Sequence, residues 1–277
     1  MSVPVVEGGV VVHQGQATRR TLVSLSDTMT PSSATESPDA VLARLHSLEG
    51  VPSALASARD GIDAVLRDRG LRRTSPETTA ESLLRGAYAS AALEGSPSTL
   101  DEVRDGVGDE TAAASARLST ELLSLAPVLR RSPLQALARL HTLAGAGGVA
   151  ESRLGRPRDA DAAGLLGVVA GMLATDAPAL LVAAVVHGEL AAAAPFASHN
   201  GLVARATERL VLVARGLDPT SLIVPEAGHL ALRPAYEGNL AGLREGGQGA
   251  VHRWLLYAAE AYAAGTEASP LVEPGER

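Results

Sequence analysis

Hydrophobic side chains recur every three or four residues along most of the chain after residue 38. In residues 51–69, for example, Leu55, Ile62 and Val65 fall on one face of a helix. This spacing is typical of amphipathic helices that bury one side against a core. One short β-like run, residues 9–12, lies near the N-terminus. The pattern therefore predicts an all-α, or mainly α, fold.

Capping and breaking residues set the expected helix boundaries. Ser37 or Asp39 can cap the first helix, Ser75 precedes a helix that opens with proline, and Asp176 can cap a central buried helix. Pro127 predicts a kink inside a long helix. The charged connector 100–110 can begin another helix. The other expected helices cover residues 39–48, 51–69, 76–94, 111–131, 133–144, 161–173, 201–216, 233–245 and 248–264.

The first 38 residues differ in composition from the rest of the chain. They mix Gly, Ser, Thr and Pro, which is typical of a flexible leader. The tail after Thr266 is polar, and we expect it to fray. Residues 39–277 are expected to form a single helical domain, because 277 residues with 46% hydrophobic content can bury a sizeable core. Aromatic residues make up 2% of the chain, so Ala, Leu and Val must fill that core.

Charge and cysteine content exclude several classes of function. The net charge is −7 and no cluster of Lys or Arg is present, so nucleic acid is not an expected partner. No cysteine is present, which excludes disulfides and thiolate metal sites. The longest apolar stretch, residues 179–195, contains His187, Glu189 and Pro195, so a buried helix is favoured over a membrane span. The N-terminus lacks a basic segment followed by an apolar run. We therefore expect a soluble, cytoplasmic protein without a membrane partner.

The stretch from His187 to Arg205 contains the most informative local pattern. An apolar helix breaks at Ala194, a turn follows through residues 195–201, and a new helix begins. The start of a helix offers free N–H groups and the positive end of the helix dipole, which together attract anions. A phosphate-binding turn is one interpretation of this pattern. A corner between two helices that binds nothing is the other.

This stretch resembles the signature of the Fic (Fido) family, H-P-F-x-(D/E)-G-N-G-R-x-x-R. The family's outlying histidine, seven residues before the signature, falls on His187. The matching positions of the signature itself are Pro195, Phe196, Asn200, Gly201 and Arg205. The chain departs from the signature at Ala194 in place of the histidine, Ser198 in place of the acid, His199 in place of the first glycine and Leu202 in place of the first arginine.

A second resemblance lies at the end of an earlier expected helix. The residues Ser90, Glu94 and Gly95 satisfy the family's inhibitory motif (S/T)-x-x-x-E-(G/N). The resemblance implies that Glu94 pairs with the second motif arginine, Arg205, and blocks seating of a nucleotide γ-phosphate. The alternative is a solvated glutamate beside a glycine that ends a helix, which is a common arrangement.

A third segment, with Gly155, Arg156 and Arg158, resembles the family's G-x-x-R segment near a short β-hairpin flap. In the family the flap holds the target's backbone by strand addition. Pro157 and the charges favour a ragged or short flap. A solvent loop with two arginines is the equally weighted alternative.

The resemblance implies a Fic-type helical domain over residues 39–277. Within it, residues 76–95 would form the inhibitory segment, residues 132–216 the core, and residues 217–265 the closing helices. Tyr236 and Trp254 lie where many members of the family carry Tyr and Trp, and core packing is their expected role.

The resemblance also implies a chemistry that this chain has partly lost. Active members transfer AMP from ATP to a Ser, Thr or Tyr hydroxyl of a target protein. Ala194 removes the general base, a loss of ~10²–10⁴ in rate. Ser198 is a weaker Mg²⁺ ligand than a carboxylate, and Leu202 carries no charge. We therefore expect a pseudoenzyme or a very weak enzyme that resembles an adenylyltransferase.

The phosphate-binding elements are better preserved than the catalytic ones. The candidate contacts are Ser198, His199, Asn200, Gly201 and Arg205, and the implied cofactor is ATP with Mg²⁺, bound weakly or lost. His199 is a weak candidate for a replacement base, with a solvated turn residue as the alternative. His187 is expected to be a neutral core histidine. No metal site is expected, because no second histidine lies within three or four residues of either one.

Three hypotheses for function follow from these patterns. The first is a degenerate Fic protein that acts as a regulator or binding module, with a target protein or a Fic-type paralogue as its partner. The second is an active nucleotidyl- or phosphoryl-transferase that uses the altered residues. The third is a purely structural helical protein. Alanine-rich helix faces also make a homo-oligomer plausible.

Overall fold

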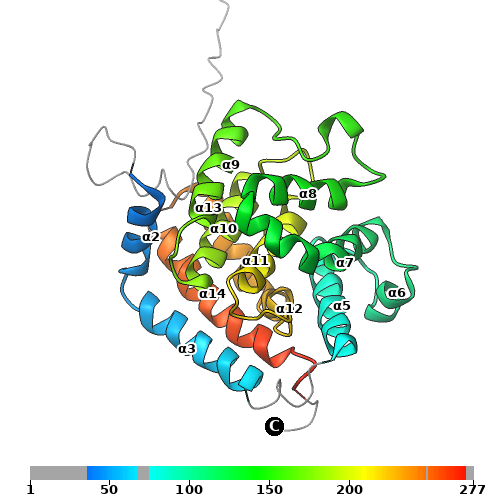
Figure 1. Cartoon of the computed structure of the whole chain (residues 1–277), viewed down its shortest axis with the longest axis horizontal. Coiled ribbons are helices and arrows are strands. Elements are labelled where there is room, and N and C mark those ends of the chain that lie inside the picture. Colours follow the sequence, from blue (N-terminus) through cyan, green and yellow to red (C-terminus); the bar gives the residue numbers. More distant parts are fainter. Residues whose placement is uncertain (1–35, 68–74, 248, 273–277) are drawn as a thin grey trace, which may run out of the picture.

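The computed structural model describes residues 36–67, 75–247 and 249–272 and shows an all-α protein (Figure 1). These residues form twelve α-helices and one 3₁₀ turn, and they contain no strand, which confirms the predicted fold class. The helices are α2 Pro38–His46, α3 Val51–Val65, α5 Pro76–Leu93, α6 Leu100–Asp105, α7 Glu110–Arg131, α8 Pro133–Gly145, α9 Ala160–Leu173, α10 Ala179–Ala193, α11 Asn200–Ala214, α12 Pro225–Ala231, α13 Arg233–Glu245 and α14 Ala250–Glu267.

Two helices, α10 and α11, form the centre of the core. Every residue from 180 to 191 of α10 is buried, as is every residue from 202 to 214 of α11. The two helices pack against each other, α7 and α8 pack on α11, and α13 and α14 pack on α10 (Figure 1). Helix α10 carries apolar side chains around its whole circumference, so it is stable only when other helices surround it. The corner between α10 and α11 is therefore held by the best-packed part of the molecule.

Local capping signals account for several of the boundaries. The Ser37 side chain accepts a hydrogen bond from the N–H of Ala40, and the Ser75 side chain accepts one from Thr78. Asp176 does not cap α10, because Pro178 is the N-cap residue and makes no side-chain cap. Helix α7, which was predicted over residues 111–131, continues through Pro127.

The structure decides between the two alternatives for residues 155–158 in favour of the loop, since residues 146–159 form turns and the short 3₁₀ segment Glu151–Arg153 without a strand. Helix α12 was not expected, because seven residues are too few for a periodic signal. Apart from residues 36–38, the proposed leader lies outside the described residues, as does the expected helix stop at Gly70.

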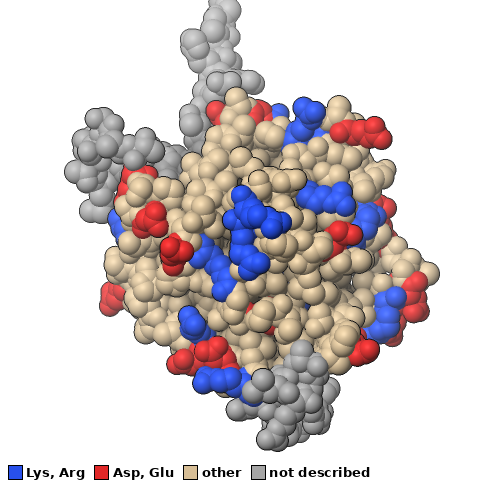
Figure 2. Space-filling view, viewed as in Figure 1, with Lys and Arg blue, Asp and Glu red and all other residues tan. Residues whose placement is uncertain are grey.

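Charged side chains are spread over the surface. Figure 2 shows acidic groups mostly toward the edge of one face and several basic groups nearer its centre. Within the described part of the chain, no helix is both long enough and apolar enough to cross a membrane.

Candidate anion pocket at the start of helix α11

The turn between α10 and α11 holds two residues in an uncommon backbone conformation. Ala194 ends α10 with φ 50°, and His199 precedes α11 with φ 56°. Residues other than glycine rarely adopt positive φ, and such strain is concentrated at functional sites. The side chain of Asn200 folds back on Phe196, accepting from its N–H at 2.8 Å and donating to its carbonyl at 3.1 Å. Asn200 therefore fixes the shape of the turn.

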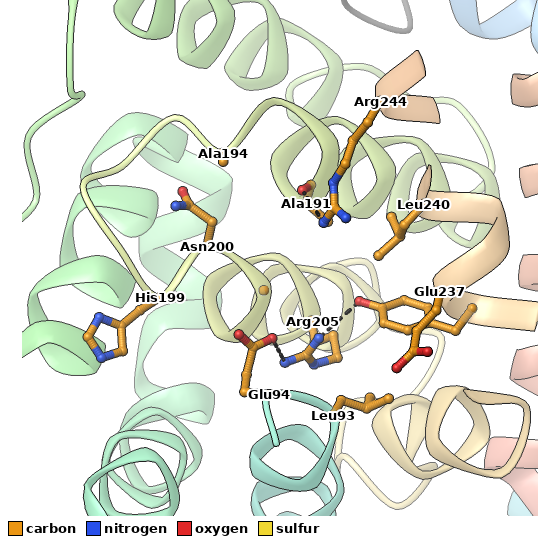
Figure 3. A pocket seen from close by; sticks show the side chains of 12 residues that line it. Leu93, Glu94, Ala191, Ala194, His199, Asn200, Arg205, Glu237, Leu240 and Arg244 are labelled. Atoms are coloured by element: carbon orange, nitrogen blue, oxygen red, sulfur yellow. Dashed lines mark hydrogen bonds and ion pairs between the residues drawn. The ribbon is translucent and has the colours of Figure 1, made fainter. Parts of the chain in front are cut away.

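Arg205 lies one turn into α11, and its buried guanidinium is fully engaged. Its side chain is 1% exposed and donates to the carboxylate of Glu94 at 2.7 Å. Further bonds go to the hydroxyl of Ser90 at 2.9 Å, to the Ser90 carbonyl at 3.0 Å and to the hydroxyl of Tyr236 at 2.9 Å. Figure 3 shows the pairing of Arg205 with Glu94. Burial opposes the positive charge, but attraction from Tyr236 and Glu94 holds the pKa of Arg205 above its ordinary value. The contact that the family resemblance implied is therefore present.

Glu94 occupies the space in front of the α11 N-terminus. A Cβ atom added at Gly201 would collide with the Oε1 atom of Glu94, so only glycine leaves room for the carboxylate there. A carboxylate in this place interacts favourably with the positive end of the helix dipole. The Glu94 side chain is still 34% exposed, which gives it an open route away from the helix. Gly95, with φ 88°, ends α5 directly after it.

A cavity of about 470 Å³ opens beside this ion pair. Four elements line it, namely α5, α10, α13 and the start of α11. Figure 3 shows Arg244 reaching over the cavity from α13, opposite Glu94 and Arg205. The lining residues are Leu93, Glu94, Ala191, Ala194, His199, Asn200, Gly201, Arg205, Tyr236, Glu237, Leu240 and Arg244.

The altered motif positions lie in different places around the cavity. Ala194 and His199 line it, whereas Leu202 is fully buried in the core. Ser198 is not part of the lining, and its hydroxyl lies 2.7 Å from Nδ1 of His199. Burial lowers the pKa of His199, with Glu94 acting in the opposite direction. His199 is the histidine among the residues that line the cavity.

The segment predicted to form either a flap or a loop supports the turn. The N–H of Gly155 donates to Nδ1 of His141 at 2.9 Å, and the N–H of Arg158 donates to the carbonyl of Pro195 at 2.9 Å. The guanidinium of Arg158 also donates to the carbonyl of Ala194. Arg156 is exposed. These contacts connect the loop to the end of α10.

Tyr236 and Arg244 are polar pocket residues that the sequence did not indicate. Tyr236 was expected only to pack in the core, yet its hydroxyl accepts a hydrogen bond from Arg205. Arg244 donates to the carbonyl of Ala191 at 3.3 Å and adds a second arginine to the cavity. Both belong to α13, and no local pattern in that helix indicates which of its side chains face α10 and α11.

His187 is a buried neutral histidine, as expected. It is 0% exposed, and its pKa is lowered to about 4, mainly by burial. The expectation that it lacks a partner histidine was wrong. His229 of α12 and Glu208 of α11 lie beside it, 42 and 21 residues away in the sequence. Spacing along a single helix cannot reveal a cluster that three helices build.

Structural comparison identifies the fold. Neither protein-family models nor curated protein sequences give a match to this chain. The crystal structure of a Fic family protein from Desulfovibrio desulfuricans G20 matches with a TM-score of 0.66 at 20% identity, over 80% of this chain and 74% of that one. A fragment of Fic-1 from C. elegans matches with a TM-score of 0.60 at 15% identity, over 79% of this chain and 71% of that one.

A second structure of the Fic-1 fragment, which carries one substitution, gives the same TM-score of 0.60. It also has 15% identity and covers 83% of this chain and 76% of that one. All three matches are to Fic proteins, and each covers about four fifths of this chain. This chain therefore has the Fic fold.

Proposed function

We propose that this chain is a catalytically impaired Fic-fold protein that acts as a regulator or binding module. Its functional site would be an anion pocket, for a phosphate or a nucleotide, that Glu94 closes from within. The observation that carries the proposal is the position of the Glu94 carboxylate, which pairs with Arg205 and fills the space above Gly201. A phosphate that binds in this position would have to displace the Glu94 carboxylate.

The chemistry of the lining supports binding more than catalysis. Ala194 has no side chain that can take a proton from a hydroxyl, and Leu202 is buried and apolar. Ser198 offers a neutral oxygen, which hard cations such as Mg²⁺ bind less well than a carboxylate. Positioning and charge neutralisation supply most of the catalysis of phosphoryl-group chemistry. The loss of three charged or titratable groups therefore removes most of the positioning and charge neutralisation that catalysis needs.

The remaining groups suit an extended anion. The positive end of α11 and Arg205 lie at one side of the cavity, and Arg244 approaches from α13 (Figure 3). A polyphosphate chain offers several negative charges, so it can interact with both arginines once Glu94 has moved. ATP and ADP are therefore the first ligands to test, and a target protein or a Fic-type paralogue is the proposed partner of the module.

Calorimetry with ATP and ADP, with and without Mg²⁺, tests the proposal. We expect Glu94→Gly to bind either nucleotide at least about tenfold more tightly than the unchanged protein, since one charge-assisted contact is worth about 1.5–3 kcal/mol. The matched control is Glu237→Gln, which alters another carboxylate of the pocket that bonds Arg233 and not Arg205. Absence of binding in all three proteins would contradict the proposal and favour a purely structural helical protein.

A weak transferase is the second candidate, and the position of His199 favours it. This ring lines the cavity and lies beside a hydroxyl group, so it is the available proton acceptor near the turn. Transfer of label from ATP to protein by Glu94→Gly, abolished by adding His199→Asn, would support this candidate. Nucleotide binding without transfer would support the non-catalytic module.

A further inference from the structure

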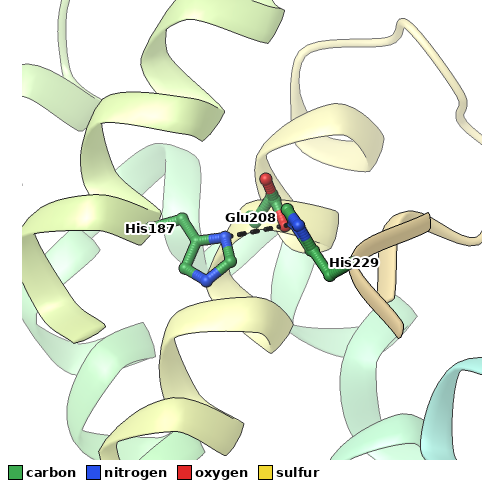
Figure 4. A group of neighbouring side chains, drawn as sticks. All are labelled: His187, Glu208 and His229. Atoms are coloured by element: carbon green, nitrogen blue, oxygen red, sulfur yellow. Dashed lines mark hydrogen bonds and ion pairs between the residues drawn. The ribbon is translucent and has the colours of Figure 1, made fainter. Parts of the chain in front are cut away.

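Three side chains from three helices converge at one buried point (Figure 4). His187 comes from α10, Glu208 from α11 and His229 from α12, and all three are 0% exposed. One carboxylate oxygen of Glu208 lies 3.0 Å from Nδ1 of His187 and 2.9 Å from Nε2 of His229. The three potential donor atoms lie within 4.8 Å of one another.

Hydrogen bonds within this cluster are incomplete. Nε2 of His229 is hydrogen-bonded to Glu208, but Nδ1 of His187 has no hydrogen-bond partner although the same oxygen is 3.0 Å away. The nitrogen is close to the carboxylate but misaligned with it. A buried polar atom without a partner costs about 1–3 kcal/mol and is uncommon in folded proteins. The Glu208 oxygen therefore lies at ion-pair distance from this nitrogen without completing a hydrogen bond to it.

The cluster combines one carboxylate with two imidazole rings, and all three side chains are closed off from solvent. Among the described residues, the ion-pair partners of Glu208 are these two histidines. A cation placed between the three donor atoms would balance the charge of a buried carboxylate.

Tyrosine hydroxyls surround the cluster in the manner of an outer shell. The hydroxyl of Tyr236 lies 3.1 Å from the outer nitrogen of His187, and that of Tyr257 lies 2.7 Å from the outer nitrogen of His229. Tyr262 donates to the second oxygen of Glu208 at 2.9 Å. Outer-shell groups of this kind fix the orientation of metal-binding side chains. Each ring therefore turns its other nitrogen toward the centre.

We propose that His187, Glu208 and His229 bind one divalent transition-metal ion, with zinc as the best match. Imidazole nitrogens and a carboxylate oxygen are zinc ligands, and bonds of about 2.0–2.1 Å place tetrahedral ligands ~3.3 Å apart. The two spacings at Glu208, 3.0 and 2.9 Å, are close to that value. The donor atoms lie up to 4.8 Å apart, so ion binding must draw the widest pair together by about 1.5 Å. Each histidine gives the metal its inner nitrogen and carries its proton on the outer one, where a tyrosine oxygen accepts it.

The ion would join the short helix α12 to α10 and α11, the centre of the core. Seven residues form α12, which is too short to be stable by itself. A metal bound only in the folded state adds its binding free energy to the stability of the fold. The proposed site is thus structural, and it is separate from any Mg²⁺ that a nucleotide would carry into the anion pocket.

Metal analysis of the refolded full-length protein tests the proposal. The protein is unfolded with a chelator, refolded with either ZnCl₂ or MgCl₂, freed of excess metal and analysed by mass spectrometry and thermal unfolding. We expect about one zinc per chain and a higher Tm after zinc refolding only. Correctly refolded protein that retains no zinc would overturn the proposal and leave a hydrogen-bonded triad.

Variants locate the ion. Tyr262→Phe removes the hydroxyl beside Glu208 and should weaken zinc affinity about 10–100-fold in a competition with a zinc indicator. His229→Gln should abolish retention of zinc. The control is His252→Gln, because His252 is an exposed histidine of α14 that bonds the carbonyl of Glu49. Zinc retention that His229→Gln and Tyr262→Phe leave unchanged would overturn the assignment, and the milder tyrosine variant provides a test if His229→Gln fails to fold.

Discussion

The anion pocket and the buried His187–Glu208–His229 cluster lie on the same two central helices, yet they differ in what closes them. In the pocket, a glutamate that is 34% exposed pairs with Arg205, and we propose that an anionic ligand replaces it. In the cluster, all three side chains are fully buried, and tyrosine hydroxyls enclose them. The two regions are connected, because Tyr236 accepts from Arg205 and contacts His187. The same two helices therefore carry a partly exposed ion pair, Glu94–Arg205, and a fully buried cluster around Glu208.

The largest expected effect comes from breaking the buried cluster. Glu208→Leu leaves His229 and the Tyr262 hydroxyl without their acceptor and removes the carboxylate 3.0 Å from His187. We expect a loss of about 3–5 kcal/mol in the free energy of unfolding, measured by urea denaturation. Glu237→Gln, at an exposed ion pair, should change stability by less than about 0.5 kcal/mol. A loss below about 1 kcal/mol for Glu208→Leu would show that the cluster does not hold the core together.

A larger side chain at residue 201 should lower the stability of the protein. Gly201→Ala places a Cβ atom against the Glu94 carboxylate and should cost about 1–3 kcal/mol of stability. The cost should fall in a Glu94→Gly background, where the remaining close contact is a nitrogen of Arg205 at 3.2 Å. A double-mutant cycle measures the difference. Equal costs in both backgrounds would place Glu94 away from the helix N-terminus in solution.

A third position, His141, should make the stability of the protein sensitive to acid. Its ring stacks on Phe196 of the turn. Burial, with a smaller contribution from His199, lowers the pKa of His141 from 6.5 to about 4. The unfolded chain therefore binds this proton more readily, and stability falls as the pH drops from about 6.5 toward 4. The slope of unfolding free energy against pH should be shallower in His141→Gln. Identical slopes for both proteins would contradict the assigned pKa.

The smallest effect is expected in the loop that supports the turn. Arg158→Ala removes the bonds to Ala194, and its side chain is 30% exposed, so stability should change by no more than about 1 kcal/mol. Hydrogen exchange in residues 195–201 should nevertheless become faster, because the end of α10 loses a support. Arg156→Ala is the matched control and should leave exchange unchanged. Faster exchange in both variants would point to a general loosening of the loop.

Much of the fold could be predicted from local patterns. Ser37, Ser75 and the glycines that end helices carry their signal in a few neighbouring residues, and α13 was predicted with the bounds observed. The all-α class followed from the same periodicity. The sequence could not decide between a hairpin flap and a loop at residues 155–158, because the loop backbone of residues 146–159 is set by contacts with His141 and the end of α10. Such contacts are invisible in the loop's own sequence.

The candidate site could also be predicted only in part. The pairing of Glu94 with Arg205 could be anticipated, because two family motifs resemble this chain in the expected order. Tyr236, Arg244 and the cluster around Glu208 could not, because their neighbours come from different helices. Sequence spacing reveals ligands that share one helix, whereas His187 and His229 meet only after α10 and α12 have packed.

The most direct test of the central claim observes Gly201 itself. In an NMR titration with ATP, the Gly201 amide resonance of Glu94→Gly should shift strongly, because the phosphate takes the place of the carboxylate at the α11 N-terminus. The same resonance in the unchanged protein should move little at the same concentration. An equal shift in both proteins, or a shift in neither, would contradict the account that Glu94 closes an anion site.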